Sequence, residues 1–242
     1  MPKRGKRYEA AARLVDPDRL YQPAEAVELV KRAAFANFDE TVEVHFKLGI
    51  DPRHADQQVR STATLPHGTG KAVRVVVFAE GDAARVAREA GVPEENVGSD
   101  ELIARIEGGF LDFDLSLAMA DQMGKVGKLG RILGRRGLMP NPRSGTVVRA
   151  VEDLPRVLDE VRGGRVEFRN DRTGLLHVPI GKKSFAEEQL ADNMLALIDA
   201  VNRAKPSGAK GVYVQSITLA TTMSPGVPLD VAGALSSAGS RR

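Results

Sequence analysis

The chain contains no cysteine and no tryptophan among its 242 residues, and only 5% of its residues are aromatic. Without cysteine, the sequence excludes disulfides, thiolate metal sites, iron–sulfur clusters and a cysteine nucleophile. Because aromatic residues are scarce, the core must consist mainly of Val, Leu, Ile and Ala side chains. The absence of cysteine also fits the reducing conditions of the cytoplasm.

Long apolar segments are missing as well. No apolar run approaches the roughly 20 residues that are needed to span a bilayer. The N-terminal sequence "MPKRGKRYEAAARLVD" is basic, but no apolar signal core follows it. We therefore expect a cytoplasmic protein that does not associate with membranes.

Motifs for phosphate, metal or nucleophile chemistry are also absent. The segment "HGTGKA" at 67–72 resembles a phosphate-binding loop, but Leu65 stands where the loop needs its first glycine and Ala72 where it needs a hydroxyl. No GxGxxG follows a strand, no GxSxG occurs, and the four histidines lack metal-ligand spacing. We predict a protein that is not an enzyme and that binds no cofactor and no metal.

Two kinds of hydrophobic pattern follow one another along the chain. Alternating apolar and polar residues predict strands with one open face at 41–50, at 58–66, in a hairpin over 165–181 that turns at 171–174, and at 211–223. Helices are expected at 23–35 and from Ser184 to Pro206. His45 and His177 fall on the polar phase of these strands, which predicts a solvated or hydrogen-bonding role.

The middle of the chain reads differently. A continuous apolar run within 72–81 is typical of a strand buried on both faces, and helical and apolar segments then alternate as far as 164. We interpret this as a small, mostly parallel α/β domain at 68–160, inserted into an α+β domain made of 1–67 and 161–230. Residues 231–242 are small and polar and predict a flexible tail. One continuous α/β domain is the alternative interpretation.

Charge divides along the same borders. Residues 69–160 carry 13 Lys+Arg and 15 Asp+Glu, a net charge of −2. Because the whole chain has a net charge of +3, the remaining residues carry +5. The densest basic run nevertheless lies inside the insertion, at 124–145. That run has six glycines and no acidic residue, and its six cations are Lys125, Lys128, Arg131, Arg135, Arg136 and Arg143. Because the surrounding domain is acidic overall, we expect this run to be a secondary contact, or a solvated loop, and not the main binding surface.

Three segments outside the insertion combine side chains that are common in RNA interfaces. They are "FDETVEVHFKLGIDPR" at 38–53, "RVEFRND" at 165–171 and "SITLATTMSPG" at 216–226. Hydroxyls, arginines and exposed apolar groups contact 2′-hydroxyls, phosphates, sugars and bases. Ordinary strand faces that end in a turn at 224–226 are the alternative.

Four motifs carry a resemblance to a known family: 38–53, "GKLGRILGRRGLMPNPRSGTV", "VEFRNDRTG" and "ATTMSPG". In this order they resemble the bacterial form of the L1 family of large-subunit ribosomal proteins, which forms the mobile stalk. The resemblance runs from about residue 3 to 227. It implies a split two-layer α+β domain with an inserted Rossmann-like three-layer α/β domain.

The resemblance also implies partners and roles. The protein is expected to act as a monomer within the cytoplasmic ribosome and to bind the stalk region of large-subunit rRNA. It is further expected to assist release of deacylated tRNA from the exit site, and to repress its own operon by binding the mRNA. The alternatives are an α/β enzyme that holds a phosphorylated ligand and a general nucleic-acid-binding protein.

Carried over motif by motif, the resemblance places the main RNA contacts at Phe38, Thr41, Glu167, Arg169, Ser216, Thr222 and Met223. Secondary RNA contacts are expected at Lys47, Arg53, Arg165, Ser224, Lys128, Arg135 and Arg136.

Three positions depart from the family pattern. Asn37 stands where Lys is common, Arg135 stands where Pro is usual, and Ser224 replaces a Gly. Glycine allows a positive φ and close approach of a sugar–phosphate, so we expect Ser224 to weaken that contact.

Overall fold

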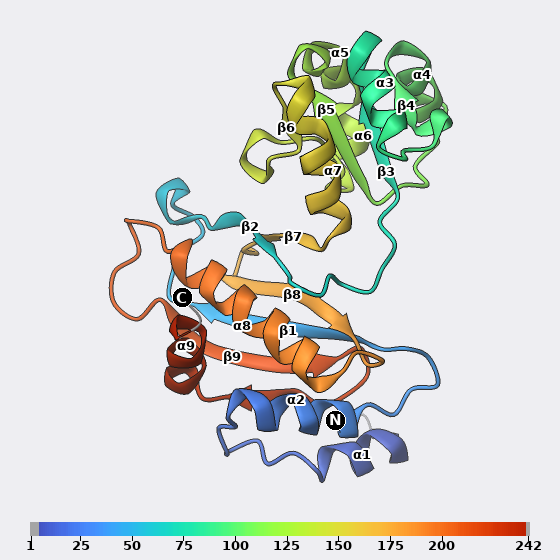
Figure 1. Ribbon diagram of the computed structural model, residues 1–242. Coiled ribbons are helices and arrows are strands. Elements are labelled where there is room, and N and C mark those ends of the chain that lie inside the picture. Colours follow the sequence, from blue (N-terminus) through green and yellow to red (C-terminus); the bar gives the residue numbers. More distant parts are fainter. Residues whose placement is uncertain (1–4, 241–242) are drawn as a thin grey trace. The chain divides into compact units, whose positions relative to one another are not determined.

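The computed structural model describes residues 5–240 and confirms a mixed α/β fold class (Figure 1). The chain divides into two compact units. The split unit consists of Met1–Gly70 and Gly163–Arg242, and the inserted unit is Lys71–Arg162. These borders lie a few residues beyond those expected from the composition, on the glycine-containing segments at either end of the insertion.

The split unit is built on a four-stranded antiparallel sheet in the order β10-β9-β1-β8. Its strands are β1 (Thr41–Leu48), β8 (Leu175–Lys182), β9 (Val214–Thr221) and β10 (Val227–Leu229). Its helices are α1 (Lys6–Ala12), α2 (Pro23–Ala33), α8 (Glu187–Arg203) and α9 (Val231–Gly239). A 3₁₀ turn, η1, spans Ala55–Gln57.

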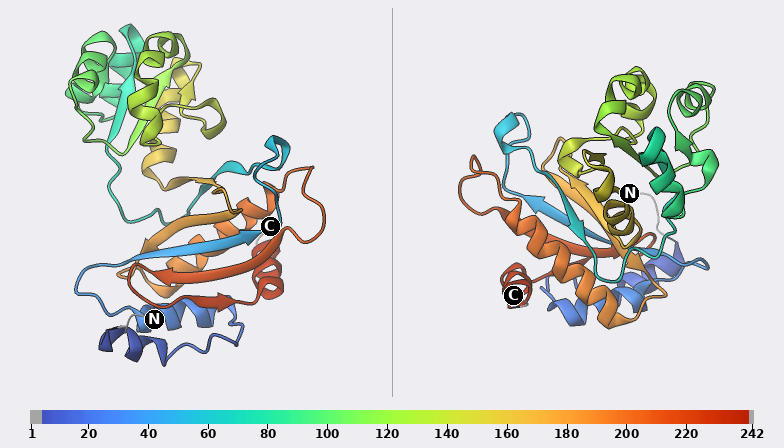
Figure 2. Two further views of the ribbon diagram at one scale, coloured as in Figure 1. Left: turned by 180° about the vertical axis from the view of Figure 1, so that it is seen from behind. Right: turned by 45° about the horizontal axis from the view of Figure 1, so that its top comes forward.

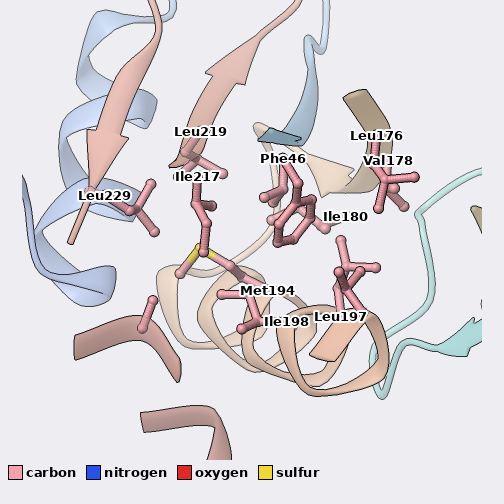
Figure 3. Close-up of a cluster of buried hydrophobic side chains, with 14 of the residues drawn as sticks. Phe46, Leu176, Val178, Ile180, Met194, Leu197, Ile198, Ile217, Leu219 and Leu229 are labelled. Atoms are coloured by element: carbon pink, nitrogen blue, oxygen red, sulfur yellow. The ribbon is translucent and has the colours of Figure 1, made fainter. Parts of the chain in front are cut away.

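One face of this sheet carries the core. Along β1 the even-numbered residues are buried and the odd-numbered residues are partly exposed, because successive side chains of a strand point to opposite faces. Phe46 lies at the centre, opposite Leu176 of β8 and Ile217 of β9. Figure 3 shows these side chains facing Met194 and its neighbours on α8. Aliphatic side chains therefore make up most of this core, with the Phe46 ring packed among them.

The hairpin expected over 165–181 is wrong in its pairing. Strand β7 (Arg165–Arg169) pairs with β2 (Arg60–Thr64) in a separate two-stranded sheet, whereas β8 pairs with β1. Asn170 ties β7 to the distant segment: its Oδ1 accepts from Val59 N at 2.7 Å, and its own N–H donates to Val59 O at 3.1 Å. The 171–174 turn is present, but the long-range partner takes the hydrogen bonds of β7.

The inserted unit contains a parallel sheet in the order β4-β3-β5-β6. Its strands are β3 (Val75–Phe78), β4 (Val97–Gly98), β5 (Leu115–Met119) and β6 (Val147–Val148). Its helices are α3 (Gly81–Glu89), α4 (Asp100–Glu107), α5 (Met123–Val126), α6 (Gly130–Arg135) and α7 (Leu154–Arg162). Five 3₁₀ turns join them: η2 (Glu94–Asn96), η3 (Ala120–Gln122), η4 (Gly127–Leu129), η5 (Pro142–Ser144) and η6 (Val151–Asp153).

Strand β3 explains why this sheet needs helices on both sides. Val75 and Val77 belong to one hydrophobic cluster, with α3 and α7, and Val76 and Phe78 belong to a second, with α4 and α6. All four residues of the strand are buried. A strand buried on both faces accounts for the continuous apolar run in the sequence.

The flexible tail predicted for 231–242 is wrong over the residues that the structure describes, which form helix α9; residues 241–242 lie outside them. Asp230 caps this helix, accepting from the N–H groups of Ala232 and Gly233, both at 3.2 Å. Ala234 and Ala238, one turn apart, are buried, and α9 packs against α8. The segment was expected to be flexible because its residues are small and polar. In the structure, its small side chains allow α9 to pack closely against α8.

The cap makes a first prediction. Replacing Asp230 by Ala should lower the free energy of unfolding by about 1 kcal/mol, because it removes the acceptor for two helix N–H groups. Urea denaturation followed by circular dichroism measures this. Asp230→Asn should be close to wild type, since Asn caps helices about as well. Equal stability of the Ala and Asn variants would show that the cap contributes nothing.

Candidate nucleic-acid interface

The face of the four-stranded sheet opposite α8 is uncovered within the split unit, as the left view of Figure 2 shows. We call it the open face. It carries the odd-numbered residues of β1, namely Thr41, Glu43, His45 and Lys47, which are all partly exposed. On the neighbouring strands it carries the residues paired with them in register. A polar, uncovered sheet face of this kind is available to a partner.

Strand pairing and the hydrogen bonds beside it bring four of the expected RNA contacts onto this face. Ser216 of β9 lies opposite Lys47 of β1. At the other end, Thr41 N donates to Thr222 Oγ1 at 3.1 Å, and Thr222 N donates to Thr41 O at 3.1 Å. Lys182 Nζ in turn donates to Thr41 Oγ1 at 2.7 Å. The sheet thus places a row of hydroxyls and cations along β1 and β9.

Two apolar side chains lie exposed in the loops at the Thr41–Thr222 end. Phe38 is 54% exposed and Met223 is 49% exposed. Exposed apolar groups beside hydroxyls suit contact with sugars and bases. Phe38 and Met223, both expected from the sequence, are therefore accessible.

A buried carboxylate that the sequence motifs did not point to organises this end of the face. Glu40 is fully buried, and its Oε1 accepts from Ala36 N at 2.7 Å. Its Oε2 accepts from Thr221 Oγ1 at 2.6 Å and from Met223 N at 3.0 Å. The loop before β1 and the loop after β9 are thereby joined through one side chain.

The hydrogen bonds determine the charge of this group. Burial by itself would raise the pKa of Glu40. The hydrogen bonds from Thr221, Ala36 and Met223, together with the nearby charge of Lys183, outweigh that effect and lower the pKa below its usual value. Position 40 has the parity of Val42 and Val44, which predicts an inward side chain. That signal was available in the sequence.

Other expected contacts lie on the second sheet. Glu167 and Arg169 are exposed on β7, and Glu167 forms an ion pair with Arg60 of β2. Arg165 is partly exposed at the start of the same strand. Arg53 is exposed in the turn after β1. The expected residues of the split unit therefore lie on two sheets and in the loops beside them, and not in a single row.

Ser224 does not adopt the positive φ for which glycine would be needed at this position. Among residues 5–240, no residue other than glycine has a positive φ. The Ser224 hydroxyl instead accepts from Thr221 N at 2.9 Å, and Ser224 N donates to Thr221 O at 3.3 Å. This serine closes the turn after β9, so the backbone reason for a weakened contact does not hold in this structure.

The basic run of the inserted unit covers α5, η4, α6 and the loop up to η5. Lys125 is engaged with Glu80 at 2.6 Å and Asp100 at 3.0 Å. Lys128, Arg135 and Arg136 are exposed, and no ion pair is found for them within residues 5–240. The run thus presents unpaired cations on the surface of its own unit.

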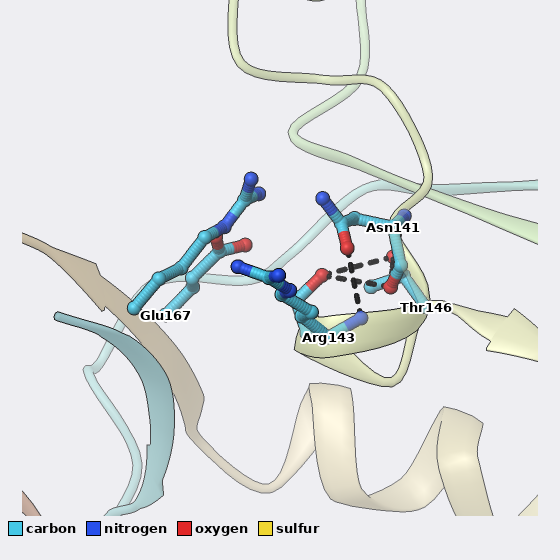
Figure 4. Close-up of polar contacts among 6 residues, drawn as sticks. Asn141, Arg143, Thr146 and Glu167 are labelled. Carbon is cyan, nitrogen blue, oxygen red and sulfur yellow. Dashed lines mark hydrogen bonds and ion pairs between the residues drawn. The ribbon is translucent and has the colours of Figure 1, made fainter. Parts of the chain in front are cut away.

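The loop that follows is held by its own hydrogen bonds (Figure 4). Asn141 Oδ1 accepts from Arg143 N at 2.8 Å, and Thr146 Oγ1 accepts from Asn141 N at 2.7 Å. Asn141 therefore stabilises the loop from within through its side chain and its backbone. The Arg143 side chain is exposed.

Histidines meet in the middle of the open face. His45 lies opposite His177, and their Nδ1 atoms are 2.8 Å apart. The hydrogen-bonding role predicted for these two residues is confirmed. In the described part of the chain, no group of three or more His, Asp or Glu residues is placed to hold a metal ion. Nor is any helix there long and apolar enough to cross a membrane.

Known proteins of similar sequence match this chain over nearly its full length. The large ribosomal subunit protein uL1 of Thermomicrobium roseum is 64% identical over 232 residues, covering 96% of this chain and 95% of the relative. The uL1 proteins of Chloroflexus aurantiacus and Dehalococcoides mccartyi are 61% and 54% identical over 231 residues, covering 95% and 96% of this chain and 96% of each relative. The chain is a structural, non-enzymatic protein of the large ribosomal subunit. It belongs to the Ribosomal protein L1p/L10e family, whose model matches residues 29–225.

The Glu40 network makes a second prediction. Glu40→Gln should lower the free energy of unfolding by about 1–3 kcal/mol, because an amide cannot accept from all three donors. Glu43→Gln is the matched control: Glu43 lies on β1, three residues after Glu40, and no hydrogen bond of its carboxylate is found within residues 5–240. Urea denaturation at pH 7 measures both. A Glu40→Gln variant as stable as Glu43→Gln would contradict the role assigned to this carboxylate.

The same network predicts a pH dependence. Because the folded-state pKa of Glu40 lies below the unfolded value, the unfolded chain binds more protons as the pH falls. Its contribution to stability is therefore complete above the usual glutamate pKa and is lost as the pH falls through the lowered folded-state value. The loss of stability between pH 6 and 3 should be smaller in Glu40→Gln than in Glu43→Gln. Parallel curves for the two variants would contradict the prediction.

Proposed function

We propose that this protein binds the stalk region of large-subunit rRNA in the bacterial cytoplasm, assists release of deacylated tRNA from the exit site, and represses its own operon by binding the mRNA. The observation that supports this best is the uncovered open face, which ends at Phe38, Thr222 and Met223 and is held in place by buried Glu40. Membership of the ribosomal family makes RNA the expected partner.

The chemistry of the face suits an RNA backbone better than DNA. Ser216 Oγ makes no hydrogen bond within the described residues, so it is available to an incoming group. Thr222 Oγ1 accepts from Thr41 N, and as a donor it reaches Thr41 O only at 3.5 Å, a long contact that a ligand can replace. Hydroxyls of this kind pair with 2′-hydroxyls, which only RNA carries. Selectivity for RNA follows from these two positions.

Charge supports the same assignment. The segments that form the split unit carry the net positive charge of the chain, and phosphate neutralisation supplies much of the affinity for nucleic acid. Arg169 on β7 and Lys47 on β1 are both placed on the surface of this unit. We assign primary binding to the split unit for this reason.

The two further roles follow from how the surfaces are shared. An mRNA that represses the operon must resemble the rRNA site, because the same open face would hold both. Free rRNA then relieves repression by competition. Exit-site tRNA needs a surface that remains accessible when rRNA is bound, and the exposed cations Arg53, Lys128 and Arg136 are candidates.

Thr222 tests the interface directly. Thr222→Val should weaken binding of a stalk rRNA fragment by about tenfold or more, since a sheltered hydrogen bond to RNA costs about 1–3 kcal/mol to lose. Thr222→Ser should restore binding. Thr64→Val is the control, because Thr64 is an exposed strand threonine that is not one of the expected RNA contacts. Fluorescence anisotropy measures affinity and a thermal melt checks folding. A Val variant that binds like Thr64→Val would remove Thr222 from the interface.

The basic run of the inserted unit makes the complementary prediction. Changing Lys128, Arg135 and Arg136 together to Ala should change the slope of log affinity against log salt by less than about 1. The control is Arg85, Arg88 and Arg156 changed to Ala, which removes the same charge from residues paired with acids. A slope change near 3 for the first variant alone would make this run the main binding surface. Equal affinity for duplex DNA would indicate a general nucleic-acid-binding protein instead.

A further inference from the structure

The histidine pair occupies the centre of the open face. His45 is flanked by His177 on one side and by Thr218 on the other. Along β1 it stands between Thr41 and Lys47, closer to Lys47, and these two residues mark the ends of the proposed interface on this strand. An RNA strand that contacts both ends must therefore pass over the pair.

The geometry of the pair fixes its hydrogen bonding. With the Nδ1 atoms 2.8 Å apart, one ring donates and the other accepts. The ring that donates through Nδ1 has a bare Nε2, and the ring that accepts has a proton on Nε2. One added proton at the bare Nε2 gives two Nε2–H donors and a single positive charge, and it leaves the Nδ1 bond intact. A second proton would place two Nδ1–H groups against each other. The pair is therefore suited to take up one proton and to resist a second.

The charged groups near the pair are few. Strand β1 contributes Glu43 and Lys47 on the same face, and Lys47 Nζ is engaged with Thr173 O at 2.6 Å. The turn before β8 contributes Asp171, whose pKa is lowered by hydrogen bonds from Leu175 and Thr173 and, least, by the charge of His177. Strands β9 and β10 add uncharged residues to this face, namely Ser216, Thr218, Ala220 and Pro228. Strand β7, which packs beside β8, carries Arg165, Glu167 and Arg169.

This environment favours a neutral pair in the absence of a ligand. Burial lowers the pKa of His45, the charge of His177 lowers it further, and Glu43 offsets part of this. An anion close to the rings acts in the opposite direction, because an opposite charge at short range favours the protonated form. Both Nε2 atoms lack a hydrogen-bond partner among residues 5–240 and so are available to such an anion.

We propose that His45 and His177 form a phosphate-binding site within the interface, and that the pair takes up one proton from solvent when an RNA phosphate binds. The two Nε2–H groups donate to phosphate oxygens in charge-assisted hydrogen bonds. This inference rests on the proposed function, because RNA supplies the phosphate. It makes RNA affinity increase as the pH falls, over the range in which the free pair is neutral and the bound pair is charged.

The test measures the affinity of the full-length protein for a stalk rRNA fragment between pH 5.5 and 8, at constant ionic strength. For the wild type, the affinity should rise toward low pH by at most about tenfold per pH unit, the limit for one linked proton. Calorimetry in two buffers of different ionisation enthalpy should show net proton uptake. His177→Asn keeps a side-chain N–H to hydrogen-bond His45 but cannot titrate, and it should lose most of the pH dependence.

The controls separate the possible outcomes. His54→Asn, which changes an exposed histidine after β1, should keep the wild-type profile and corrects for titration of the RNA itself. An unchanged profile in His177→Asn, or no proton uptake by the wild type, would overturn the inference while leaving the proposed function standing. Failure of the wild type to bind the fragment at any pH would overturn the proposed function. If His177→Asn does not fold, ring ¹⁵N shifts of wild-type His45 and His177 serve instead: at a fixed pH they must show proton uptake by the pair when RNA is added.

Discussion

One buried carboxylate determines the geometry of the proposed interface. Glu40 ends the loop that carries Phe38, precedes β1, and accepts hydrogen bonds from Thr221 and Met223 at the end of β9. Its backbone carbonyl also accepts from Lys183 N at 2.8 Å, which adds the end of β8. Three strand ends therefore meet at one residue. A buried charge is tolerated only where its hydrogen-bonding capacity is satisfied, so each of these contacts depends on the others.

This arrangement explains how two large apolar side chains remain exposed. Phe38 and Met223 would gain free energy by moving into the core, by about 1.5–3 kcal/mol each. The backbone of Met223 is held by Glu40 Oε2, and the loop that carries Phe38 is held through Ala36 N. The polar network inside the protein thus maintains the apolar groups on its surface. Positions fixed in this way require little reorganisation when a partner binds, and that favours affinity.

Strict alternation was enough to predict β1, because only one register buries Val42, Val44 and Phe46. The continuous apolar run of β3 likewise identified a strand covered on both faces. Local patterns could not reveal that β7 prefers β2 to β8, since Asn170 and Val59 are far apart in sequence. Local patterns also did not predict α9, because its alanines form an apolar face only where the helix packs against α8. In the proposed interface, the sequence motifs pointed to the exposed residues. They did not point to Glu40, because it lies in the loop before β1, where alternation along the strand was not applied.

The insertion is compatible with this fold because its two ends start from adjacent points of the split unit. Leu65 N donates to Gly164 O at 3.1 Å, and a Cβ added to Gly164 would lie 2.3 Å from the Cα of Gly68. Only glycine at 164, with φ near 105°, allows the two chain segments to pass so closely. Buried Asn193 of α8 secures the outgoing segment: its Oδ1 accepts from His67 N at 3.0 Å and its Nδ2 donates to Gly68 O at 2.8 Å. The outgoing segment is thereby anchored to α8, on the side of the sheet away from the open face.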